Sequence, residues 1–168
     1  MRRSILVPVM VLLVLSPSAV QAGPDDFVVC DAPPSGATVI QPNDTKSSSP
    51  AAPQYDPRSE TKIDLQFQLD LYPAKKGDTA TVSAALDWEV TVNDWDLYLR
   101  RQNGTVMAQS RNTQLGPLED PPGESLSRTV EHCDVFYVTI ENFQAVAVDD
   151  VDPLDLTVSV GNGPSLTL

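Results

Sequence analysis

The chain has 168 residues, and its 23 acidic residues outnumber its 11 lysines and arginines, which gives a formal net charge of −12 at pH 7. A surface this acidic repels nucleic acid and anionic lipid, so neither is expected as a partner. The length is that of one domain with a hydrophobic core of its own.

The first 22 residues have the three parts of a secretory signal peptide. Two arginines open the segment, residues 5–15 are apolar, and Val20-Gln21-Ala22 supplies small residues at the cleavage positions. The apolar run is shorter than the roughly 20 residues that a membrane-spanning helix needs. We therefore predict cleavage after Ala22 and a secreted protein, extracellular or periplasmic, whose mature chain has no transmembrane segment.

The next part, residues 23–60, is predicted to be an N-terminal segment followed by a linker. Phe27-Val28-Val29 predicts a short strand or a docked segment that ends at Cys30. Residues 32–60 are rich in Pro, Ser, Asp and Ala and contain few apolar side chains. Such a composition is typical of an extended, poorly ordered connector.

The chain has two cysteines, Cys30 and Cys133. In a secreted protein such a pair most simply forms a disulfide, and the alternative is two free buried thiols. A bond between them would close a loop of about 100 residues, which removes about 4.7 kcal/mol of unfolded-state entropy in the chain-entropy model. It would also attach the N-terminal segment to the body of the fold.

From residue 61 to the end, short runs alternate apolar and polar residues, which is the period of a β-strand with one buried face. The expected strands are 61–72, 80–88, 94–100, 105–110, 125–130, 133–140 and 154–160, with Gly, Pro and Asn turn signals between them. No stretch has a helical period. Seven or eight short strands predict an all-β fold, an antiparallel β-sandwich, over residues 61–168.

The strand at 94–100 has two contrasting faces. One face carries Trp95, Leu97 and Leu99, and the other carries Asp94, Asp96, Tyr98 and Arg100. We expect the first face to be buried and the second to be wet. Trp88 and Trp95 are then core residues; the alternative is an exposed aromatic platform for a sugar ring or a peptide.

Several short motifs in this order resemble the bacterial pre-peptidase C-terminal (PPC) domain family. They are Gly77-Asp78, Asp94-Trp95-Asp96-Leu97-Tyr98-Leu99, Asn103-Gly104, Phe136-Tyr137-Val138 and Leu156-Thr157-Val158. The resemblance covers about residues 61–160 and implies a small jelly-roll-like β-sandwich of the kind appended to secreted proteases and other exported proteins. The chain departs from the family at His132-Cys133-Asp134, where Gly-Thr-Tyr is usual.

Two groups of carboxylates are candidate calcium ligands. Asp94 and Asp96 share a strand face, about 6.8 Å apart along the strand, and Asp149, Asp150, Asp152 and Asp155 form a second acidic group. Some members of the resembled family bind calcium at acidic loops. Neither group has the spacing of an EF-hand, and the alternative is an acidic face in contact with water. Calcium is the one cofactor that the sequence suggests.

The sequence predicts that the protein is not an enzyme. A cysteine–histidine pair needs side chains within hydrogen-bond reach, and neighbours such as His132 and Cys133 point to opposite faces of a strand. Tyr98, on the expected wet face, is the candidate ligand-binding residue. The predicted function is a secreted, non-enzymatic module that binds extracellular protein or polysaccharide; the alternative is a calcium-binding structural or envelope-associated protein.

Overall fold

The computed structural model describes residues 27–50, 62–89, 93–111, 123–144 and 153–161. Its nine strands are β1 (Thr38–Ile40), β2 (Thr45–Ser48), β3 (Lys62–Leu69), β4 (Thr79–Trp88), β5 (Asp94–Arg101), β6 (Val106–Ser110), β7 (Gly123–Glu131), β8 (Val135–Gln144) and β9 (Leu154–Val160). None of the described residues belongs to a helix long and apolar enough to cross a membrane. The predicted signal peptide lies outside the described residues.

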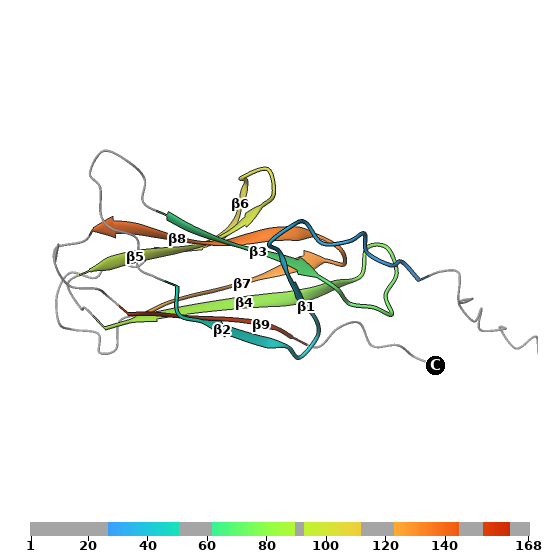
Figure 1. Ribbon diagram of the computed structural model, residues 1–168, viewed down its shortest axis with the longest axis horizontal. Helices are drawn as coiled ribbons and strands as arrows, with labels where there is room; N and C mark the ends of the chain where they lie inside the picture. The colour runs from blue at the N-terminus through green and yellow to red at the C-terminus, as the bar shows by residue number, and fades with distance from the viewer. Residues whose placement is uncertain (1–26, 51–61, 90–92, 112–122, 145–152, 162–168) are drawn as a thin grey trace, which may run out of the picture.

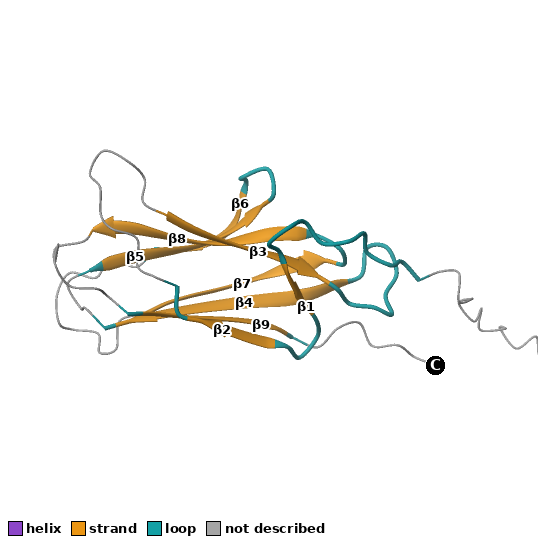
Figure 2. Cartoon of the chain, viewed as in Figure 1, coloured by secondary structure: helices purple, strands orange, loops and turns teal. Residues whose placement is uncertain are grey.

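The strands form two sheets that lie one above the other (Figures 1 and 2). One sheet has the order β1-β3-β8-β5-β6, and the other has the order β2-β9-β4-β7. All pairs of neighbouring strands are antiparallel except β1 and β3. The all-β sandwich predicted from the sequence is therefore confirmed.

The core lies between the two sheets and follows the predicted alternation. In β4 and β9 every second side chain is buried. The β4 residues that face the core are Ala80, Val82, Ala84, Leu86 and Trp88, and those of β5 and β8 are Trp95, Leu97, Leu99, Phe136, Val138 and Ile140. The rings of Phe67 and Phe136 stack with centroids 5.6 Å apart. Fully burying a side chain such as Leu97 stabilises the fold by roughly 1.5–3 kcal/mol.

Two strands lie in the segment that the sequence predicted to be irregular. β1 runs parallel to β3, with Ile40 opposite Leu69 and fully buried, and β2 runs antiparallel to β9. A turn closed by the bond from the Asp44 N–H to the Gln41 carbonyl carries the chain from one sheet to the other. The expected absence of regular structure is therefore wrong at 38–40 and 45–48. Backbone pairing at a sheet edge holds these strands, and it leaves no apolar alternation in the sequence.

The turn between β7 and β8 also differs from the prediction. The expected strand began at Cys133, whereas β8 begins at Val135. Cys133 has a left-handed backbone (φ 69°), and the Asp134 N–H bonds to the Glu131 carbonyl to close the turn. His132 and Cys133 therefore lie in a turn, and the expectation that they point to opposite faces of a strand is wrong.

Candidate functional site

The second face of β5 is buried, contrary to the prediction of a wet face. Asp94, Asp96 and Tyr98 are 4%, 5% and 6% exposed, respectively. The reason is the place of β5 inside the sheet, between β8 and β6. Arg100 of β5 itself and Arg111, which follows β6, also extend over this outer face, where they contact Tyr98 and Asp96. Period-two alternation is present, but here it separates two buried faces.

Tyr98 and Asp96 form the centre of a polar network on this face. The Tyr98 hydroxyl donates to Asp96 Oδ2 at 2.9 Å, and Arg111 Nε donates to the same oxygen at 3.2 Å. Burial, the hydrogen bond to Asp96 and the charges of Asp96 and Glu141 raise the pKa of Tyr98 well above its ordinary value. Tyr98 is therefore a neutral, fixed hydrogen-bond donor.

A second arginine completes the network. Arg100 pairs with Glu141 of β8, and its guanidinium carbon lies 4.5 Å from the centroid of the Tyr98 ring, in cation–π contact. Glu141 is the cross-strand neighbour of Asp96. Like charges placed opposite each other destabilise a sheet, and the two arginines offset that repulsion. The cluster is consequently ordered and close to charge balance.

A pocket of about 280 Å³ opens beside this network. Its described lining is Asp94, Asp96, Gln109, Arg111 and Phe143. Phe143 is 57% exposed, so one ring of apolar surface faces solvent at the pocket. Carboxylate, amide, guanidinium and an exposed aromatic ring thus meet within one hollow.

Sequence reasoning missed three of these lining residues. Gln109 lies on β6 opposite Tyr98, and Arg111 follows the end of β6. The expected strand ended at residue 140, whereas β8 continues through Phe143 to Gln144. The available signal was the alternation of Tyr137, Thr139 and Glu141, which Phe143 extends on the same face.

The two tryptophans occupy the core, as predicted. Trp88 and Trp95 are almost fully buried, and the Trp88 indole N–H donates to the Asn93 carbonyl at 3.1 Å. The aromatic surface available to a ligand at this face therefore comes from Phe143 instead.

Two of the candidate calcium ligands, Asp96 and Asp155, already accept hydrogen bonds from protein groups. Asp96 Oδ2 already accepts from the Tyr98 hydroxyl and from the Arg111 guanidinium, so a cation at that oxygen would compete with Arg111. Asp155 accepts a hydrogen bond from the Ser49 hydroxyl at 2.8 Å. The other three aspartates of that acidic group lie outside the described residues, and calcium binding stays a prediction.

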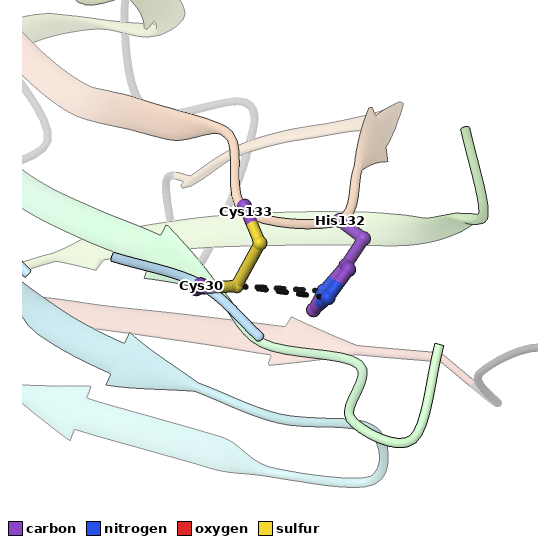
Figure 3. Close-up of side chains that lie close together, drawn as sticks. All are labelled: Cys30, His132 and Cys133. Carbon is purple, nitrogen blue, oxygen red and sulfur yellow. Dashed lines mark hydrogen bonds between the residues drawn. A yellow bond between two sulfur atoms is a disulfide. The ribbon is translucent and has the colours of Figure 1, made fainter. Parts of the chain in front are cut away.

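The disulfide between Cys30 and Cys133 is present, as predicted (Figure 3). The His132 ring lies against it, with Nδ1 3.6 Å from Cys30 Sγ. Nδ1 accepts the Leu71 N–H at 3.1 Å, and Nε2 is 2.9 Å from the Val28 carbonyl, to which it donates. His132 therefore binds the N-terminal segment to the turn after β3.

The same bonds limit the chemistry of these three residues. Cys30, His132 and Cys133 form a group of potential metal ligands in the described part of the chain. The two sulfurs are joined to each other, so neither offers a thiolate. Both ring nitrogens of His132 are engaged with backbone groups, which leaves neither available as a base in this conformation.

No protein-family model matches the sequence, and no curated protein matches it. Among solved structures, the chain is similar to the pre-peptidase C-terminal domain of collagenase from Bacillus anthracis (11% identity, TM-score 0.41, covering 77% of this chain and 99% of that one). It is also similar to CsCBM6-3 from Clostridium stercorarium, solved in complex with cellobiose (10% identity, TM-score 0.40, 74% and 98% covered). A third is a periplasmic inhibitor of g-type lysozyme from Aeromonas hydrophila (10% identity, TM-score 0.38, 74% and 96% covered). These similarities carry no function to this chain.

Proposed function

We propose that this chain is an exported, non-enzymatic β-sandwich module of the pre-peptidase C-terminal type that binds an extracellular polysaccharide. The ordered series of family-like motifs and the sandwich fold support the type of module. The signal-peptide pattern and the disulfide support export, because disulfides form in oxidising compartments.

The observation that carries the binding site is the pocket beside Phe143. A sugar ring has an apolar C–H face and a rim of hydroxyls that both donate and accept hydrogen bonds. Phe143 offers a ring for the apolar face, while Asp94, Gln109 and Arg111 offer acceptors and donors for the rim. The volume of about 280 Å³ is near the lower end for small-molecule pockets, which suits one sugar unit of a polymer.

Tyr98 acts in this proposal as a positioning residue, not as a direct contact. It is buried beneath the guanidinium of Arg100, and its hydroxyl donates a hydrogen bond to the Asp96 carboxylate. Asp96 in turn orients Arg111 at the pocket. Side chains that are ordered before binding lose little entropy on binding, which favours affinity for a weakly binding ligand such as a sugar.

A non-catalytic role fits the state of the reactive side chains. The chain has one histidine and two cysteines. The histidine is hydrogen-bonded to backbone at both nitrogens, and the cysteines are bonded to each other. Arg111 donates to Asp96 Oδ2, so a calcium ion at that oxygen would have to displace the guanidinium.

The test is affinity electrophoresis in gels that contain soluble neutral polysaccharides, together with pull-down on insoluble cellulose and chitin. We expect at least one polymer to retard the wild-type protein. Phe143→Ala should weaken that binding at least about tenfold, since a ring contact worth roughly 1.4 kcal/mol corresponds to that factor. The matched control is Val106→Ala, which truncates an exposed apolar side chain outside the pocket, on β6. Equal binding by Phe143→Ala, or no binding to any polymer, would contradict the proposal.

A further inference from the structure

We infer that edge strand β1 and the pocket beside it form a second docking site, for an extended cationic segment of another protein that carries one apolar anchor residue. This site is separate from the saccharide pocket. It shares none of the described lining residues of that pocket.

Exposed apolar side chains are concentrated at this place. The large hydrophobic residues that are exposed within the described ranges are Val29, Val39, Tyr72, Val106 and Phe143. Three of these five line a single pocket of about 330 Å³, namely Val29, Val39 and Tyr72. Apolar side chains scattered singly over a surface need no explanation, whereas a group of them around a hollow marks an interaction site.

The walls of this pocket are fixed. Cys30 is held by the disulfide, and Val28 forms a β-bridge with Ala74 and accepts from His132. Gln68 is buried and donates from Nε2 to the Asp31 carbonyl at 3.3 Å. The apolar residues therefore lie on an ordered surface, which lowers the entropy lost when a partner binds.

The pocket lies at the open edge of a sheet. β1 is the last strand of the five-stranded sheet, with Val39 opposite Gln68 of β3. No strand of the described ranges pairs with the other side of β1. An extended peptide can add to such an edge through its backbone and place an apolar side chain in an adjacent pocket, which is a common mode of peptide recognition.

Charge decides the kind of partner. Asp31 and Asp70 line the pocket, and its described lining contains no lysine or arginine. Asp70 accepts hydrogen bonds from the Tyr72 N–H and the Gln41 amide, which are neutral groups, so its negative charge is not offset there. A second copy of this chain carries the same net charge of −12 and would be repelled. A segment with lysine or arginine two residues to either side of an apolar residue presents all three side chains on one face.

The experiment measures binding of three capped pentapeptides to the whole mature protein by NMR chemical-shift titration. The probe has the sequence Lys-Thr-Leu-Thr-Lys. One control replaces Leu by Ser, and the other replaces both Lys by Glu. We expect the probe to shift resonances of β1 and its pocket. Both controls should bind at least about tenfold more weakly than the probe. For the peptide with Ser in place of Leu, losing a buried leucine contact alone accounts for such a factor.

Two variants and a matched control locate the site. Val39→Ser and Tyr72→Ser should each weaken binding of the probe severalfold. Val106→Ser replaces a valine of similar exposure on β6, the opposite edge strand, and should leave binding unchanged. Phe143→Ala should also leave it unchanged, which separates this site from the saccharide pocket. The inference is overturned if the probe does not bind, if the Glu peptide binds equally well, or if Val39→Ser has no effect. Self-association of the protein that Val39→Ser abolishes would assign the edge to a second copy and overturn it too.

Discussion

Asp96 and Glu141 lie directly opposite each other on neighbouring strands β5 and β8, although both are acidic. Each has its own arginine, because Arg111 contacts Asp96 and Arg100 contacts Glu141. Tyr98 joins the two ion pairs, because its hydroxyl donates to Asp96 and its ring lies against the Arg100 guanidinium. The outer face of the sheet is therefore an ordered polar network.

Asp96→Asn should destabilise the fold by about 1–3 kcal/mol, because the buried Tyr98 hydroxyl and Arg111 lose their charged acceptor. The loss should be the same with added calcium and with a chelator, as measured by urea unfolding. Asp87→Asn, an exposed aspartate on β4, is the control and should change stability by less than about 0.5 kcal/mol. A calcium-dependent gain in the wild type that the Asp96 variant loses would instead support a calcium site.

Alkaline pH should destabilise the protein through Tyr98. Its pKa is raised in the folded state by burial, by its hydrogen bond to Asp96 and by nearby carboxylates. The unfolded chain ionises its tyrosines near pH 10, so the stabilising contribution of Tyr98 is present below that pH and is lost as the pH rises above it. Ultraviolet difference absorbance should show one of the four tyrosines ionising only on unfolding. Tyr98→Phe should remove this late step, whereas its persistence in the variant would show that another tyrosine is responsible.

Removal of the disulfide should lower stability by about 4–5 kcal/mol, since residues 103 apart in sequence are joined and the chain-entropy term for such a loop is of that size. A Cys30→Ser, Cys133→Ser double variant tests this by denaturant unfolding. Adding a reductant to the double variant should have no further effect. If reduction of the wild type leaves stability unchanged, the bond does not constrain the unfolded chain as expected.

His132→Ala should destabilise the fold by about 1–3 kcal/mol, because the Leu71 N–H and the Val28 carbonyl lose their partner in a buried setting. Amide hydrogen exchange at Leu71 and in the N-terminal segment should accelerate. His132→Gln, which keeps a polar side chain able to accept and donate, should recover part of the loss. Unaltered exchange at Leu71 in the alanine variant would refute the role of His132 as the link between these segments.

Export predicts a defined amino terminus. Material secreted from cells that express the full sequence should begin at or near Gly23, because cleavage is expected after Ala22. Edman or mass-spectrometric sequencing measures this directly. Retention of Met1 on exported protein would contradict the signal-peptide prediction.

The alternation of buried and exposed residues along β4 and β9 could be predicted from the sequence because it follows from the local geometry of a strand. In β4 and β9 one face packs on the core and the other meets solvent, so the pattern of residues and the pattern of burial coincide. The turn at Asn103-Gly104 was predictable for a similar reason, since Gly104 has φ 84°, a backbone conformation that glycine adopts without steric cost. The disulfide was readable because only two cysteines were available.

The sequence by itself determined the strands between residues 62 and 160, their buried apolar faces and the cysteine pair, since each depends on neighbouring residues or on a single choice of partner. Only the tertiary structure decided that the polar face of β5 is buried. Tyr98 lies beneath Arg100, and the partner of Arg100 is Glu141, which lies 41 residues later in the sequence. It also decided that Thr38–Ile40 and Thr45–Ser48 are strands and that His132 faces the disulfide. Those features come from backbone pairing and from contacts between distant segments, and such contacts leave no period in the sequence.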